Sequence, residues 1–196
     1  MVYKMNKNDS RKEFSQFLPQ RFFIFIRGWI MLIFGSFLSI FSLLAPNVQV
    51  MTVDTGWLPI ASFMIILIGL LECFDTYLSK QTNRFIINLQ FAVMDTVFGV
   101  VFLFVLGYGY EFSFFVVLYL LVKGIFRVFA ASIGGFPHRK TTIIGGMIST
   151  VFGILIWIKL PSALPIGFIS FCLFFEIALR GLALLRFATW LREIEN

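Results

Sequence analysis

Charged side chains inside the apolar segments of this chain are the residues best able to do chemistry. Each unpaired charge near the centre of a bilayer costs at least about 2.5–3.5 kcal/mol on insertion scales. An acid in such a position can accept a proton or bind a small solute, and a base can serve as its counter-ion. The chain holds four acids and four bases there: Arg27, Glu72, Asp75, Asp95, Lys123, Arg127, Glu176 and Arg180.

Balanced numbers of acids and bases favour mutual ion pairs over a proton relay, in which a carboxylate stands without a permanent cation. At 1.5 Å per residue from the basic ends of their spans, Asp95 lies roughly 15 Å deep and Lys123 roughly 14 Å, so we expect them to meet. Glu176 and Arg180 are four residues apart on one helix, which predicts a pair along that face.

Arg27 lies at the same expected depth as Glu72 and Asp75, which predicts a third set of ion pairs. The alternative interpretation is a buried polar site that moves protons or a small solute. In that case Asp95, Glu72 and Glu176 are the candidate proton acceptors.

Motifs of known enzymes are missing from the sequence. The single histidine, His138, lies in a basic turn, which leaves no His-based triad and no Cys/His metal site. Cys73 and Cys172 fall in apolar runs, where buried free thiols are expected. With no phosphate-binding loop or dinucleotide motif, we expect no enzymatic activity, no metal and no cofactor.

The overall composition is that of an integral membrane protein. Of 196 residues, 59% are hydrophobic and only 13% are charged, against roughly 45–50% and 25% in soluble domains. The chain has 16 basic and 10 acidic residues, but the basic ones gather at the ends of the apolar runs. They therefore indicate membrane topology and lipid contacts rather than nucleic-acid binding.

Six apolar runs are long enough to cross about 30 Å of hydrocarbon. They predict an all-α integral membrane protein in which the six spans form three helical hairpins, about 22–78, 85–133 and 141–187. The expected spans are 22–44, 57–78, 85–106, 112–133, 141–158 and 164–187, with tails at 1–21 and 188–196.

Loop charges orient these spans. Lys80 and Arg84 mark one basic turn and Arg139 and Lys140 another, whereas the loops on the opposite side hold one basic residue, Lys159. By the positive-inside rule, both termini are expected in the cytoplasm of a bacterial cell, with the chain in its inner membrane.

Small residues recur at helical spacing and suggest a repeat. In three of the spans, two small residues are seven positions apart, which is two helical turns. Both therefore lie on one helix face, where another helix can approach closely. The first spans of the hairpins carry Gly28 and Gly35, Ala92 and Gly99, and Gly146 and Gly153; the second spans carry Gly69, Gly124 and Gly181. We expect three copies of one hairpin, and the same faces allow a homo-oligomer.

Several segments resemble the HdeD-like family of small bacterial inner-membrane proteins over about 21–192. The matching segments are RGWIMLIFG and LLAP in the first hairpin, IGLLECFDTYLSK at its end, and GGMISTVFGILIWIKLP and RGLALLRFATWLR in the third. Ala92 stands where the first hairpin has Gly28, and Gly107 where it has a turn proline. The resemblance implies paired-helix repeats and a role in acid resistance, and it implies no catalytic residues.

The leading functional hypothesis is thus a non-enzymatic membrane protein of the HdeD type that contributes to acid or envelope stress tolerance. A small transporter or channel that uses Asp95, Lys123, Glu72 and Glu176 is one alternative. The other is a membrane partner or assembly factor of a larger complex whose identity the sequence leaves unknown.

Overall fold

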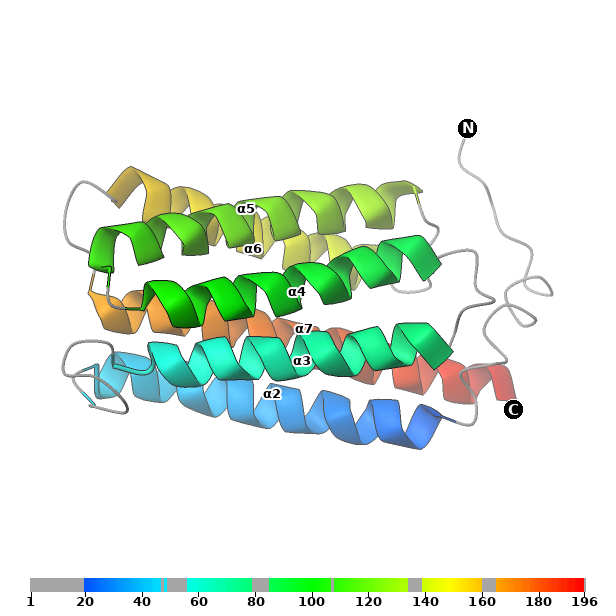
Figure 1. Ribbon diagram of the computed structural model, residues 1–196. Coiled ribbons are helices and arrows are strands. Elements are labelled where there is room, and N and C mark those ends of the chain that lie inside the picture. Colours follow the sequence, from blue (N-terminus) through cyan, green and yellow to red (C-terminus); the bar gives the residue numbers. More distant parts are fainter. Residues whose placement is uncertain are drawn as a thin grey trace.

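A computed structural model of the protein describes residues 20–46, 48, 56–78, 85–106, 108–133, 139–159 and 165–195. Within these ranges the chain is all-helical, with no strand. The helices are α2 (Arg21–Leu44), α3 (Leu58–Leu78), α4 (Phe85–Val105), α5 (Gly109–Ile133), α6 (Arg139–Lys159) and α7 (Ile166–Glu195). They run lengthwise through one bundle, and α2 begins at the end of the bundle where α7 finishes (Figure 1).

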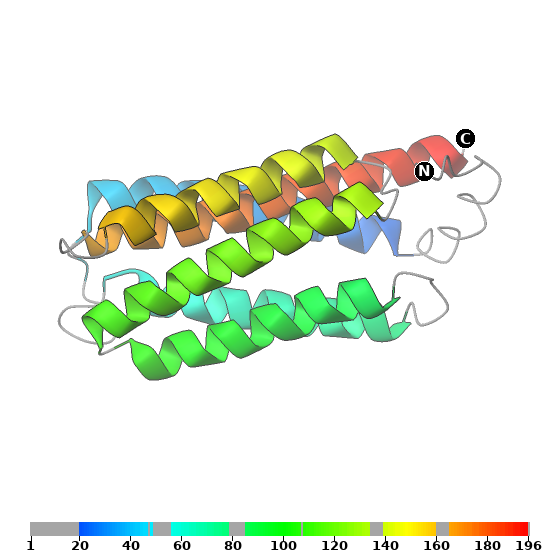
Figure 2. The same ribbon diagram turned by 90° about the horizontal axis from the view of Figure 1, so that it is seen from above.

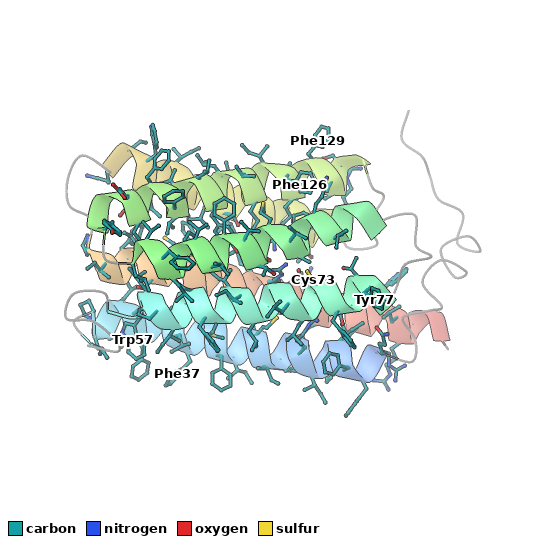
Figure 3. All side chains as sticks on the ribbon, in the orientation of Figure 1. Phe37, Trp57, Cys73, Tyr77, Phe126 and Phe129 are labelled. Carbon is teal, nitrogen blue, oxygen red and sulfur yellow. The ribbon has the colours of Figure 1, made fainter. Side chains whose placement is uncertain are left out.

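Five of these helices are long and apolar enough to cross a membrane, and α4 contributes a further apolar stretch, Leu89–Val105. Large apolar side chains cover the outside of the bundle, as expected where lipid is the solvent. Phe37 on α2 and Phe129 on α5 are 55% and 61% exposed and point away from the bundle on opposite sides (Figure 3). These features are those of a multi-pass membrane protein.

The closest packing joins the helices into three antiparallel pairs. These are α2 with α7, α3 with α4, and α5 with α6. Seen from above, α3 and α4 form one side of the bundle, α2, α6 and α7 form the other, and α5 crosses between them (Figure 2). Looser contacts of α4 with α5, α6 with α7 and α3 with α7 connect the pairs.

Small residues make the close approach of α2 and α7 possible. A Cβ atom added at Gly35 would lie 2.6 Å from the Ala178 nitrogen, and one at Gly181 would lie 2.7 Å from the Gly28 carbonyl oxygen. Real Cβ atoms are not found so close to backbone atoms, so neither position accepts a larger residue without a shift of one helix. The two backbones therefore touch directly through their glycine faces.

Glycines lie at the same kind of contact in the other two pairs. In the α3–α4 pair, a Cβ at Gly69 would lie 2.6 Å from the Thr96 nitrogen, and one at Gly99 would lie 2.9 Å from the Ile66 nitrogen. In the α5–α6 pair, Cβ atoms at Gly124 and Gly146 would each lie 2.7 Å from the carbonyl oxygen of the other glycine, and one at Gly153 would lie 2.9 Å from the Leu121 side chain. Each of the helices that the structure describes thus presents a small-residue face to its pair partner.

The pair partners are not the helices of one predicted hairpin. The expected hairpin 22–78 would join α2 to α3, whereas α2 packs most closely against α7, and α3 against α4. Glycine spacing identifies the face that another helix approaches, but it does not identify that helix. The sequence pattern therefore predicted the contact faces and left their partners open.

Several boundaries differ from the expected ones. The expected span 164–187 is shorter than the helix observed, because α7 continues to Glu195 and takes in most of the predicted tail 188–196. Ala188 and Leu191 are buried and pack with Ile24 of α2, which keeps this last part helical and attached to the bundle. Arg139 and Lys140, expected in a loop, form the first turn of α6. The expectations for the tail 1–19, for Lys80 and Arg84, for Gly107 and for His138 fall outside the described residues.

An apolar core fills the half of the bundle farther from the start of α2. Its largest side chains include Phe102 of α4, Phe112 and Leu120 of α5, and Leu173 of α7, each at most 2% exposed. These residues leave the charged side chains to the other half of the bundle.

Candidate functional site

The four acids and four bases singled out within the apolar segments lie in one largely buried group, here called the charged cluster. Arg27 comes from α2, Glu72 and Asp75 from α3, Asp95 from α4, Lys123 and Arg127 from α5, and Glu176 and Arg180 from α7. Helix α6 contributes the hydroxyl of Ser149, so each of the described helices takes part. The group lies in the half of the bundle that contains the start of α2 and the end of α3.

Asp95 is the centre of the cluster and is fully buried. Its Oδ1 lies 3.0 Å from Lys123 Nζ and accepts a hydrogen bond of 2.9 Å from the Tyr119 hydroxyl. Its Oδ2 accepts a hydrogen bond from Arg180 Nη1. Both oxygens therefore have charged or polar partners, which a buried carboxylate requires.

Lys123 is 1% exposed and connects two acids. In addition to its pair with Asp95, its Nζ lies 3.5 Å from Glu176 Oε1. It also donates a hydrogen bond of 2.5 Å to the Tyr119 hydroxyl, which can accept it while donating to Asp95. Tyr119 thus extends the charge pair into a three-residue unit.

Glu176 has a second cation and a hydroxyl beside it. Arg127 Nη1 lies 2.9 Å from Oε1, and Ser149 donates to Oε2. The Ser149 hydroxyl also lies 2.9 Å from the carbonyl oxygen of Gly145, so its single proton has two acceptors within reach. Oε1 makes its ion pairs without a well-aligned hydrogen bond.

Arg180 bridges two acids from two helices. Its Nη1 donates to Asp95 and its Nη2 donates to Glu72. The planar guanidinium presents its donors in a fixed fork, so one arginine can hold both carboxylates at once. At the edge of the cluster, Arg27 Nη1 donates to Asp75 Oδ2.

Every ion pair found among the described residues joins two different helix pairs. The α2–α7 pair binds the α3–α4 pair through Arg27–Asp75 and through Arg180 with Glu72 and Asp95; the α5–α6 pair binds the others through Lys123 with Asp95 and Glu176, and through Arg127–Glu176. Close glycine contacts therefore hold helices within each pair, and charges bridge from pair to pair.

The structure brings together some of the expected partners and separates others. Asp95 meets Lys123, and Arg27 meets Asp75. The expected pair of Glu176 with Arg180 is wrong, because Glu176 binds the cations of α5 while Arg180 binds the acids of α3 and α4. The charges on neighbouring helices decided which partner each side chain takes, and the spacing of four residues along α7 did not.

Tyr119 and Ser149 belong to the site, and the sequence reasoning missed both. Tyr119 lies four residues before Lys123 on the same helix, a spacing that brings two side chains together. This spacing was the available signal for Tyr119. Ser149 offered no such signal, because its partner Glu176 belongs to another helix.

The chemistry of the cluster is that of compensated charge. Each of its acids and bases has an oppositely charged partner. Among the described residues, no group of three or more His, Cys, Asp or Glu side chains is arranged to hold a metal ion. The free thiols of Cys73 and Cys172 are half-buried and buried.

Comparisons with known proteins identify no family. No protein-family model, curated protein or solved structure matches this chain.

Proposed function

We propose that this protein is a non-enzymatic multi-pass membrane protein of the HdeD type, and that it contributes to acid or envelope stress tolerance in a bacterial inner membrane. In this proposal the charged cluster is a structural element that holds three helix pairs in register, and the three predicted hairpins are copies of one unit. The resemblance in sequence supports the stress role.

One observation carries the structural role of the cluster. Its acids and bases are equal in number and paired with one another, and each ion pair crosses from one helix pair to another. Removing one partner of a buried ion pair costs about 3–5 kcal/mol, because the other charge stays buried without compensation. Any other arrangement of the helices would leave some of these charges buried without a partner, so it would be less stable than the native one.

Proton flux into proteoliposomes tests this role against transport. Purified protein is reconstituted with a pH-sensitive dye inside the vesicles, and a pH gradient is imposed. We expect no flux above that of protein-free vesicles, either for the wild type or for Asp95→Asn. A flux that the wild type shows and that folded Asp95→Asn protein lacks would replace the proposal with a transporter centred on Asp95.

Survival of bacterial cells after acid challenge tests the stress role separately. Cells that produce the wild-type chain are compared with cells that produce Arg180→Met, which removes the bridge between two acids, and with the exposed-site control Arg139→Gln. We expect the wild type and Arg139→Gln to raise survival and Arg180→Met to lose the effect. Equal survival with the wild type and an empty vector would contradict the stress role.

A further inference from the structure

We propose that the bundle opens at its charged end along the interface between the α2–α7 pair and the α3–α4 pair. The three interfaces that join the helix pairs are not alike, and over the described residues this one lacks the aromatic packing of the other two. The inference concerns motion and stands apart from the stress role proposed above.

Ring packing distinguishes the three interfaces first. The interface of α4 with α5 contains the ring pairs Phe91–Phe126, Phe98–Tyr119 and Phe102–Phe112. The interface of α6 with α7 contains Phe152 against Phe171 and Phe175. Across the described parts of α2 and α7 on one side and α3 and α4 on the other, no ring pair is formed.

Helix packing also sets this interface apart from the other two. Helix α4 packs against α5, and α6 packs against α7, so each of these chain neighbours also supports an interface between pairs. Over their described residues, α2 and α3 are not closely packed, and the interface depends on α3 with α7. Ion pairs therefore carry a larger share of this interface than of the other two.

Two of the three ion pairs in this interface, Arg27–Asp75 and Arg180–Glu72, are also the most accessible ones of the charged cluster. The third, Arg180–Asp95, is buried. The side chains of Glu72 and Asp75 are 17% and 20% exposed, against 0% for Asp95 and 2% for Glu176. The Nε atom of Arg27 is buried without an acceptor, so the pair of Arg27 with Asp75 leaves part of the guanidinium unsatisfied. Pairs that are partly exposed and incompletely bonded are the least costly to separate.

The other end of the same interface is held by apolar packing. Leu58 and Ile65 near the start of α3 belong to one buried cluster with Ile169 and Leu173 of α7. This packing and the buried pair of Arg180 with Asp95 act as the hinge. Separation of Arg27 from Asp75 and of Arg180 from Glu72 then parts the two helix pairs at the charged end only.

Distances between paired spin labels test the proposal in lipid nanodiscs. After Cys73→Ser and Cys172→Ala, three exposed positions near the charged end give one label on each helix pair: Phe23→Cys on α2, Tyr77→Cys on α3 and Phe129→Cys on α5. Each combination of two labels measures the distance between two of the helix pairs, which gives three distances in all. We expect the distance between positions 23 and 77 to have the broadest distribution of the three in the otherwise unaltered chain.

A charge-neutral variant and a matched control sharpen the test. Arg27→Gln with Asp75→Asn should lengthen the 23–77 distance by on the order of 5 Å, the scale of one helical turn in known switching motions. The control is Arg127→Gln with Glu176→Gln, which removes another pair whose arginine is equally buried and should leave the 23–77 distance unchanged. The proposal is overturned if another distance is the broadest, or if the first variant leaves the 23–77 distance as it was.

Discussion

Asp95 Oδ1 lies 3.0 Å from Lys123 Nζ, with both side chains almost completely buried. This pair joins α4 to α5 and therefore connects two helix pairs whose glycine faces are already occupied within each pair. Its contribution to folding differs from that of an exposed ion pair, because neither charge can return to water while the bundle stays closed.

Neutralising Asp95 alone should destabilise the bundle, and neutralising both partners should destabilise it less. Asp95→Asn leaves Lys123 without its closest acid, which we expect to lower the free energy of unfolding by about 3–5 kcal/mol. Asp95→Asn with Lys123→Met should recover much of that loss, and a two-by-two mutant cycle measured by unfolding in detergent gives the coupling. A double variant as unstable as the sum of the single ones would contradict a direct pair.

Two adjacent glycines of α6 should respond oppositely to alanine. A Cβ at Gly146 would lie 2.7 Å from the Gly124 carbonyl oxygen, whereas one at Gly145 would meet only Arg127 Nη1 at 3.4 Å. We expect Gly146→Ala to cost about 1–3 kcal/mol through overpacking. Gly145→Ala should be neutral or stabilising by up to about 1 kcal/mol, because alanine favours the helix. Thermal unfolding of the two variants side by side provides the comparison, and equal effects would rule out the close α5–α6 contact.

Removal of one oxygen from Tyr119 should weaken the charged cluster without disturbing its packing. The ring contacts Phe98 and Phe102, and Phe retains those contacts. The lost hydroxyl accepts from Lys123 and donates to Asp95, so Tyr119→Phe should cost about 1–3 kcal/mol. Tyr108→Phe, at a position 62% exposed, is the control and should leave the unfolding temperature unchanged.

The two cysteines should differ in their reaction with a thiol reagent. Cys172 is 0% exposed within the apolar core, so a maleimide should modify it only when the bundle unfolds. Cys73 is half-buried and should react in the folded protein. Mass spectrometry after timed labelling measures both rates, with Cys73→Ser to isolate Cys172. Rapid modification of Cys172 in native conditions would mean that the core is open to the reagent.

The sequence predicted single-helix properties better than relations between helices. Apolar run length depends on each segment alone, and α2 and α3 differ from their expected spans by only a residue. The depth of Asp95 and Lys123 along their helices was enough to predict that they meet. The partners of helices and of charges could not be predicted in this way. Gly28 and Gly35 form a face that several helices could fit. Glu176 pairs with two cations of α5 in place of Arg180.

The pairing of α2 with α7 has a consequence for biosynthesis. Helix α2 is made before the other described helices and α7 after them, yet each is the other's closest partner. During insertion, the glycine face of α2 therefore stays in lipid until nearly the whole described chain has been translated. Contacts between such distant segments slow folding, so the completed bundle forms only when α7 arrives and fills the place beside α2. Premature termination before α7 would leave a chain with an exposed glycine face and with Asp95 and Glu72 deprived of Arg180, features that membrane quality control can detect.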